Sequence, residues 1–229
     1  MFLIIKKIAF VSILVVCAFS ATAQNGNFRK PDYQSMKKTI ADANSPFYYP
    51  PLMKRYMADD TTLTIEEYRY LYYGSSLDTG YAAYGNPSVR EQLRNEKDVD
   101  KIIELEKKAI KEFPFNIRDI YNLNVKLEEK GDKVGASIYN HKLIGIVKAI
   151  MSTGDGLTDS TAMYVINVGH EYDLIGLLGY QFGGSQALIR AKNESMDKMK
   201  LKKNDDNIEY LYFNVDALFA GLYDLFKTD

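Results

Sequence analysis

The most site-like side chains of this 229-residue sequence are His170, Glu171 and Asp173, which lie close together near a predicted helix start. An imidazole beside carboxylates can bind a metal ion or exchange protons. A zinc-protease helix needs a second histidine four residues after the first, and that position holds Leu174. Acidic residues in a first helical turn also offset the positive end of the helix dipole. The cluster therefore indicates either a structural helix start or the centre of a hydrolase or metal-dependent enzyme.

A second candidate is the loop of residues 152–160, where Asp155 and Asp159 offer oxygen ligands suited to Ca²⁺. The ligand spacing of an EF-hand is absent from this loop. Asp and Gly are also ordinary residues of tight turns, and the polar run 204–207 has the same explanation. A turn is the simpler interpretation of both loops, and we predict no resident metal or cofactor.

The sequence lacks the common motifs of nucleophilic and nucleotide chemistry. No Gly-x-Ser-x-Gly elbow occurs, and neither Gly183-Gly184 nor the glycines at 154 and 156 continue into a phosphate-binding loop. The 29 Lys and Arg residues balance 30 Asp and Glu residues, which leaves a net charge of −1. Because backbone binding to nucleic acid needs a clustered positive field, we expect no nucleic-acid partner. The lack of an assembled catalytic set argues against an enzyme.

Tyrosine is the compositional excess of this chain, with 18 residues against no Trp. Tyr68, Tyr70, Tyr72 and Tyr73 fall in one predicted helix, where Tyr68 and Tyr72 share a face and the other two point elsewhere. Tyrosine combines a large apolar area with a hydroxyl that can stay hydrated. Three interpretations follow: packing inside the fold, a surface for a protein or peptide partner, or a glycan or small-ligand site within the Tyr-rich region 47–84.

The elements that position these residues follow a predicted targeting segment. Residues 1–23 carry two lysines, an apolar run and the small-x-small end Ala21–Ala23, which is the pattern of a cleaved secretory signal peptide. The apolar run is shorter than the ~20 residues that span a bilayer, so an uncleaved anchor is the lesser alternative. Lipid attachment at Cys17 is another, although the preceding Val16 is bulky. We expect a periplasmic or extracellular protein whose mature chain has no cysteine and no transmembrane helix.

The mature chain is predicted to be mainly helical after a polar, flexible lead-in over residues 24–31. Thr64 and Glu67 have the spacing of a capping box, which places a helix start there. Apolar residues at intervals of three and four predict three amphipathic helices in the middle of the chain. Pro114 and Gly131 separate these helices. Helices joined by such short loops must pack as antiparallel neighbours. The predicted helices cover residues 33–43, 51–57, 64–73, 87–95, 99–113, 117–130 and 133–150.

The middle helices carry part of a known repeat pattern. Ala109 and Pro114 fall where one repeat would close, and Leu123, Gly131 and Ala136 fall in register in the next. Over about residues 98–151 the chain resembles tetratricopeptide repeats, although the signature Trp-Leu-Gly-Tyr positions are mostly replaced. An ordinary three-helix segment is the alternative. The resemblance implies stacked helices whose concave face holds a peptide, and a non-catalytic interaction or scaffold module is the leading functional interpretation.

The chain changes character after residue 151. Residues 162–168 favour a strand, and residues 170–178 look like a short helix. Alternation near Met199, the turn residues 204–207 and the run 208–215 together predict a hairpin. We therefore predict a mainly α fold of stacked antiparallel helices over residues 32–151, tetratricopeptide-like in the middle. An α+β region over residues 152–229, with a small antiparallel β element, packs on this helical body.

Two segments of the C-terminal region carry a resemblance to a family. Residues 154–179, GDGLTDSTAMYVINVGHEYDLIGLLG, followed by IEYLYFNVD at 208–216, resemble an uncharacterised family of secreted bacterial proteins. In that family, tetratricopeptide-like helices precede a short β-containing tail. The resemblance implies export and this architecture over most of the mature chain. It implies no activity, and the partner and the oligomeric state stay open.

Overall fold

The computed structural model describes residues 28–77, 87–191 and 194–219. These residues form two compact units, which are described separately: a helical unit of residues 32–149, and a sheet unit of residues 28–31 and 150–219. The predicted signal peptide with Cys17 lies outside the described residues, as do Tyr81 and Tyr84. The domain limits expected from the sequence stay predictions.

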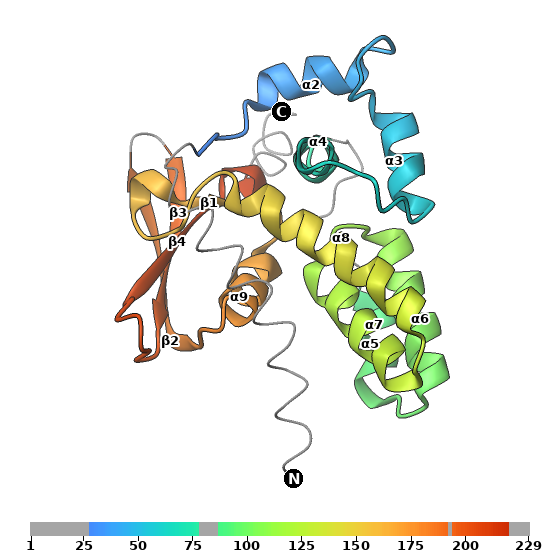
Figure 1. Cartoon of the computed structure of the whole chain (residues 1–229). Coiled ribbons are helices and arrows are strands. Elements are labelled where there is room, and N and C mark those ends of the chain that lie inside the picture. The colour runs from blue at the N-terminus through green and yellow to red at the C-terminus, as the bar shows by residue number, and fades with distance from the viewer. Residues whose placement is uncertain (1–27, 78–86, 192–193, 220–229) are drawn as a thin grey trace, which may run out of the picture. The chain divides into compact units, whose positions relative to one another are not determined.

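The prediction of a mainly α fold with a small β element is confirmed (Figure 1). Helices α2 to α8 begin in the helical unit, and α9 with four strands belongs to the sheet unit. None of the helices in the described ranges has the length and apolar character to cross a bilayer. The helices are α2 Tyr33–Ala41, α3 Tyr49–Met57, α4 Ile65–Ser75, α5 Pro87–Asn95, α6 Val99–Glu112, α7 Ile117–Lys130, α8 Lys133–Met151 and α9 Val168–Leu177. The strands are β1 Met163–Tyr164, β2 Phe182–Ala191, β3 Glu194–Leu201 and β4 Tyr210–Asn214, and a 3₁₀ turn, η1, covers Asp159–Thr161.

Local capping groups set several helix limits of the helical unit. Thr64 and Glu67 form the predicted capping box, in which each side chain accepts from the backbone N–H of the other residue. Asn116 caps α7 through the backbone N–H of Asp119. Gly131 ends α7 with φ +85°, a left-handed conformation that glycine adopts without a steric penalty. These limits are therefore determined by residues adjacent in the sequence.

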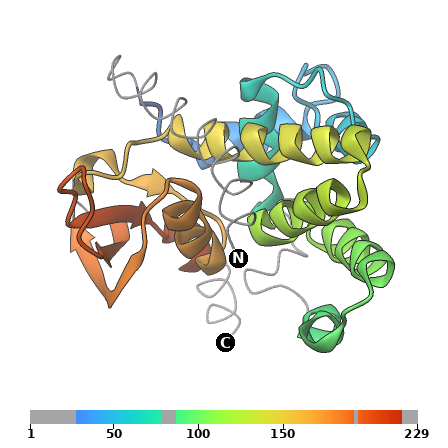
Figure 2. The same ribbon diagram turned by 60° about the horizontal axis from the view of Figure 1, so that its bottom comes forward.

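Helices α6 and α7 pack through their apolar faces, and a hydrogen bond links α7 to α8. Ile103 and Ile110 of α6, and Ile120 and Leu123 of α7, are buried, and α6 packs against α7 (Figure 2). The Asn124 side chain of α7 donates a hydrogen bond to the Ala136 carbonyl of α8 at 2.6 Å. The likeness of these helices to tetratricopeptide repeats stays a prediction.

Helix α8 also carries a glycine against which an aromatic ring lies flat. A Cβ atom added to Gly145 would come within 2.4 Å of Cε2 and Cζ of Tyr68 in α4. The Tyr68 side chain is 1% exposed, and its ring meets that of Tyr56 edge-on at 6.0 Å between centroids. Only a residue without a side chain lets α8 approach the ring this closely.

The four strands form one sheet in the order β1-β4-β3-β2. The predicted hairpin is confirmed, because β3 and β4 pair antiparallel from Met196 with Asn214 to Lys200 with Tyr210. The sheet as a whole is mixed, since β1 pairs with β4 in parallel. This differs from the purely antiparallel element expected from the sequence, because two residues of β1 add to the free edge of β4.

Residues 182–191, for which no strand is predicted from the sequence, form β2 and pair antiparallel with β3. Gly183 and Gly184 weaken the strand pattern there, and the register shifts between Phe182 and Gln186. Gly184 has φ +86°, a conformation that favours glycine. From Gln186 to Ala191 the pairing is regular, and this regular half is the part of β2 that matters below.

The last residues of the predicted flexible lead-in contact the sheet unit. The backbone N–H of Arg29 donates to the Ser152 carbonyl at 2.9 Å. The Lys30 ammonium pairs with the Glu194 carboxylate at 2.9 Å, and the Tyr164 hydroxyl donates to the same carboxylate at 2.8 Å. Residues 29 and 30 therefore have defined positions on the sheet unit.

Candidate functional site

The histidine and acids singled out in the sequence lie at the start of α9, which packs against β2 (Figure 1). Asn167 caps this helix by accepting from the Gly169 backbone N–H at 2.8 Å. The His170 and Glu171 side chains are buried, at 2% and 0% exposure, whereas Asp173 is half-buried. The three side chains therefore do not meet at a common solvent-exposed surface.

Glu171 belongs instead to a polar cluster, here called the carboxyl cluster, in which Glu171 and Asp197 are buried, Tyr172 is half-buried and Gln186 is exposed. The Gln186 side-chain amide donates to the Asp197 carboxylate at 2.5 Å. The Tyr172 hydroxyl donates to Oε1 of the Gln186 side chain, also at 2.5 Å. The cluster joins α9 to β2 and β3, and Asp197 lies on β3, which has a neighbouring strand on each side. The sequence alone does not single out Gln186 and Asp197, because strand pairing is what brings them to Glu171.

Burial makes Glu171 an unusual acid. Removal from water, followed by the negative charge of Asp197, raises the pKa of Glu171 to about 9. Neither of its carboxyl oxygens makes a hydrogen bond of normal geometry within the described residues. At neutral pH the Glu171 side chain is therefore a neutral acid beside the Asp197 carboxylate. A neutral acid can donate a proton or a hydrogen bond, but Glu171 has no exposed surface through which a substrate could reach it.

The acidic loop before β1 is occupied by turn contacts. The Asp155 carboxylate accepts from the Leu157 backbone N–H at 3.0 Å and from the Thr161 hydroxyl at 2.6 Å. Asp159 is exposed and begins η1. Among the described residues, no three His, Cys, Asp or Glu side chains are arranged to hold a metal ion. Turn formation accounts for the contacts of Asp155.

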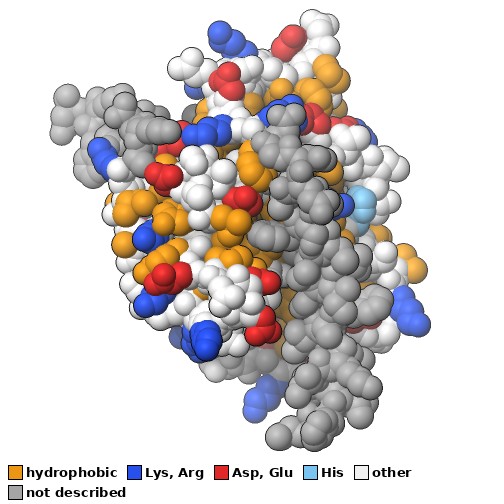
Figure 3. Space-filling view, turned by 60° about the vertical axis from the view of Figure 1, so that its left-hand side comes forward, with side chains coloured by type: hydrophobic (Ala, Val, Ile, Leu, Met, Phe, Trp, Pro, Cys, Tyr) orange, Lys and Arg blue, Asp and Glu red, His pale blue; other side chains and the backbone are white. Residues whose placement is uncertain are grey.

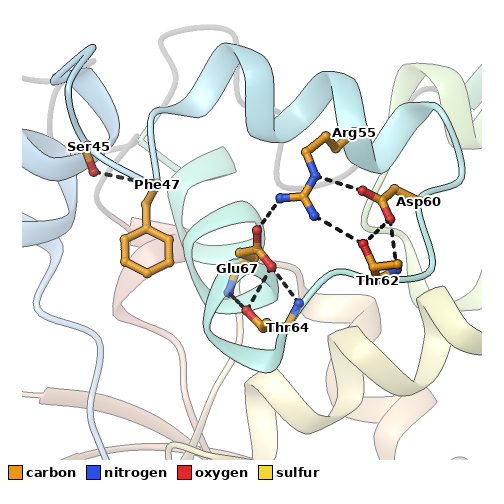
Figure 4. Close-up of polar contacts among 7 residues, drawn as sticks. All are labelled: Ser45, Phe47, Arg55, Asp60, Thr62, Thr64 and Glu67. Atoms are coloured by element: carbon orange, nitrogen blue, oxygen red, sulfur yellow. Dashed lines mark hydrogen bonds and ion pairs between the residues drawn. The ribbon is translucent and has the colours of Figure 1, made fainter.

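The tyrosines of α4 are mainly packing residues. Tyr68, Tyr72 and Tyr73 are fully buried, so their rings present no surface to a partner. Tyr70 stacks on Phe47 with 4.1 Å between ring centroids and 12° between planes. Phe47 is placed by a turn in which the Ser45 hydroxyl accepts from its backbone N–H (Figure 4). Packing thus explains the side-chain positions of these tyrosines.

An arginine connects the end of α3 to the start of α4 (Figure 4). The Arg55 guanidinium donates to Asp60 at 2.8 Å and to Glu67, the residue that also completes the α4 capping box. Hydrogen bonds from Thr62, and then the one from Arg55, lower the pKa of Asp60 to about 2. The cluster is open to solvent and joins neighbouring elements, so it has a structural explanation.

A buried lysine in α8 forms a third cluster. The Lys142 ammonium pairs with the Asp59 carboxylate at 2.5 Å and lies 4.6 Å from the Tyr56 ring centroid and 5.3 Å from that of Tyr139. Its side chain is 6% exposed, against 40% for Asp59. Asp59 has φ +61°, a left-handed conformation that is uncommon for non-glycine residues and that Asn and Asp adopt more readily than most. The chain therefore accepts backbone strain at the position that supplies the carboxylate.

Replacing Asp59 with Asn is expected to lower the free energy of unfolding by about 1–3 kcal/mol. The full cost of breaking a buried ion pair is about 3–5 kcal/mol, and it is reduced here because Asp59 is partly hydrated. Asn tolerates the same left-handed backbone, so the charge is the main change. Urea unfolding followed by circular dichroism measures the loss.

Two further variants test this explanation. Lys142→Met removes the buried charge and keeps an apolar side chain beside the rings of Tyr56 and Tyr139. We expect a smaller loss of unfolding free energy than for Asp59→Asn. Asp205→Asn removes an exposed turn carboxylate, with an expected change within about 0.5 kcal/mol. Equal stability of Asp59→Asn and Asp205→Asn would show that the ion pair contributes nothing.

The edge of β2 that faces away from β3 is exposed. This strand is last in the sheet, so among the described strands only β3 pairs with it, and residues 183–188 are largely exposed. Leu188 is 58% exposed although it stands opposite buried Asp197, on the core-facing side of the sheet. Edge strands are ordinarily protected by Pro, Lys, inward charges or coverage. The regular half of β2 contains neither Pro nor Lys, and its one charged residue is Arg190.

The surface on the side of the sheet unit has mixed character. In Figure 3, hydrophobic side chains reach the surface between scattered Lys, Arg, Asp and Glu side chains. Among the residues coloured by type, neither sign of charge forms a continuous area in this view. This face therefore offers no single-sign field that would select a strongly charged partner.

Comparison with known proteins gives a family and no activity. A family model described as "Domain of unknown function (DUF4919)" matches residues 34–221. The match extends from α2 beyond β4 and so includes both units. No curated protein and no solved structure matches the chain. The function must therefore be inferred from the geometry of the chain itself.

Proposed function

The chain belongs to the DUF4919 family, a family of unknown function, and we propose that it is an exported, non-catalytic protein-interaction module. The observation that carries this proposal is the open edge of β2. An edge strand presents backbone N–H and C=O groups that an extended segment of another chain can pair with. The proposed module therefore binds its partner by adding a strand beside β2.

The energetics of strand addition suit a reversible interaction. Each backbone hydrogen bond contributes about 0.5–1.5 kcal/mol net. Leu188 adds apolar area, since an exposed leucine is covered when a strand lies beside it. Gln186 to Ala191 pair with β3 without a register shift, so a partner strand meets a preformed template.

The alternatives from the sequence lack a supporting observation among the described residues. An enzyme centred on His170, Glu171 and Asp173 needs access for a substrate, and the first two side chains are buried. A glycan site over residues 47–84 needs exposed rings, and three of the four tyrosines of α4 are buried. We therefore keep the interaction module as the proposed function.

Affinity capture from the native envelope fraction tests this proposal with a charged variant. Leu188→Lys places a charge at the middle of the regular edge, and we expect it to weaken retention of a specific partner at least about tenfold, or 1.4 kcal/mol. Val134→Lys is the matched control, because Val134 is 74% exposed and lies in the helical unit. A partner retained equally by Leu188→Lys would contradict the proposed site. Turnover of a substrate, with no specific partner recovered, would contradict the proposal that the protein is a non-catalytic interaction module.

A further inference from the structure

We infer that the segment bound at the edge of β2 is β2 of a second copy of this chain, paired antiparallel about Leu188. The inference rests on the proposed function and commits it to one partner. It follows from the order of side chains in the regular half of β2, from the distribution of charge along the strand and from the direction that each side chain faces.

The strand is complementary to itself when it is paired in this way. A two-fold axis at Leu188 places Leu188 opposite its counterpart, Ala187 opposite Ile189 of the second copy, and Gln186 opposite Arg190 of the second copy. Residues directly opposite each other share a face of the sheet. The two leucines therefore meet on the core-facing side, and a small side chain meets a large one on the other side.

The charge pattern is consistent with this pairing. Arg190 is the one charged residue of β2, and it lies two positions from the axis. Like charges directly opposite each other destabilise a strand pair, and here each arginine faces a glutamine. An acidic or basic peptide would find no matching row of charges on β2, whereas a strand with a single charge and apolar residues at its centre fits. The regular half of β2 is itself such a strand, with Ala187, Leu188 and Ile189 at its centre.

The two leucines supply the apolar contact on the core-facing side of the proposed interface. Leu188 stands opposite Asp197 of β3, and its neighbours on the same face of β2 are Gln186 and Arg190. Leu188 is 58% exposed at this edge. A second Leu188 would cover it, because burial of each leucine side chain is favourable.

The proposed dimer is weak, because the bulge between Phe182 and Gln186 limits the regular stretch. Pairing over so few residues buries less than the ~1,200 Å² of a standard stable interface, so we expect a Kd of about 10–100 µM. Measurements must therefore reach several hundred micromolar.

Sedimentation equilibrium of the protein purified from the compartment where it accumulates tests the inference over about 10–300 µM. We expect a monomer–dimer equilibrium for the unmodified protein and for Val134→Lys. Leu188→Lys should raise Kd at least about tenfold with an unchanged circular dichroism spectrum. A protein that is monomeric throughout, or a dimer unaffected by Leu188→Lys, would overturn the inference.

A cysteine pair tests the register itself. Leu188→Cys places two thiols directly opposite each other across the axis, within the Cα separation of about 4.4–6.8 Å that a disulfide requires. Ala187→Cys places them diagonally, at about 7–8 Å or more. Mild oxidation should therefore crosslink the first variant and not the second, as read by non-reducing electrophoresis. Equal crosslinking, or more in Ala187→Cys, would contradict pairing about Leu188.

The outcomes separate this inference from the proposed function. If the protein is monomeric at every concentration but retains another protein that Leu188→Lys loses, the second copy is the wrong partner and the edge remains the interaction site. If Leu188→Lys changes neither self-association nor capture, both the partner and the site are wrong.

Discussion

Replacing Gly145 with Ala is expected to lower the free energy of unfolding by about 1–3 kcal/mol, although Ala is the better helix former. The new Cβ would lie 2.4–2.6 Å from three atoms of the Tyr68 ring. This ring has little room to move, because it also contacts the rings of Tyr56 and His141. Either α8 or α4 must shift, and the contacts between them are lost in part. Urea unfolding followed by circular dichroism measures the loss.

Two controls separate the clash from other effects. A Cβ added to Gly176 of α9 would meet no neighbouring heavy atom within 4 Å, so Gly176→Ala should raise stability by about 0.5–1 kcal/mol. Tyr68→Phe keeps the ring and removes a buried hydroxyl that has no hydrogen-bond partner within the described residues. It should be neutral or stabilising. A Gly145→Ala protein as stable as Gly176→Ala would contradict close packing of Tyr68 on α8.

Replacing Glu171 with Gln is expected to raise the free energy of unfolding at pH 7 by about 3 kcal/mol. The pKa of Glu171 is raised from 4.5 to about 9 on folding, by burial and by Asp197. Between these two values the unfolded chain releases the proton and the folded chain keeps it. Stability is therefore greatest below pH 4.5 and falls by about 1.4 kcal/mol per pH unit as the pH rises toward 9.

Gln resembles the protonated acid in shape, so the variant and the unmodified protein should be about equally stable near pH 4.5. Above that pH the difference between them should grow with pH, as measured by urea unfolding at intervals from pH 4.5 to 8.5. Glu209→Gln is the matched control, because it removes an exposed carboxyl from the same unit. A stability difference between Glu171→Gln and the unmodified protein that stays constant over this range would refute a protonated, buried Glu171.

Glu106 also makes the free energy of unfolding depend on pH, and comparing Glu171→Gln with the unmodified protein removes this effect. Burial, followed by the charge of Asp119, raises the pKa of Glu106 to about 7. Its pKa is raised on folding, as that of Glu171 is, so the stability that protonated Glu106 contributes is lost as the pH rises from 4.5 toward 7. Because both proteins in the Glu171 comparison retain Glu106, its effect cancels in the difference.

The fold was predictable where the deciding residues are close in sequence. The capping box of Thr64 and Glu67 and the stop at Gly131 act within one helical turn, so their positions identify helix limits directly. The hairpin of β3 and β4 was predictable for the same reason, since alternation and a polar turn are local signals. By contrast, β1 is two residues long and depends on its neighbour β4, and β2 begins with glycines that hide its pattern.

The candidate sites show the same division. The sequence identifies His170 and Glu171 as chemically notable, but the pKa of Glu171 depends on its burial and then on Asp197, which lies on β3. The four tyrosines of α4 are visible in the sequence, but the burial of three of them depends on the packing around α4. Residue type and spacing could therefore propose surfaces but could not decide which side chains reach solvent.

By itself the sequence determined the mainly helical fold, the local helix limits and the hairpin, because these depend on backbone preferences and on contacts a few residues apart. Only the tertiary structure decided that Tyr68 packs on Gly145, that Glu171 is buried beside Asp197 and that β2 ends the sheet with an open edge. Each of these depends on residues far apart in the chain, which are brought together by packing and strand register.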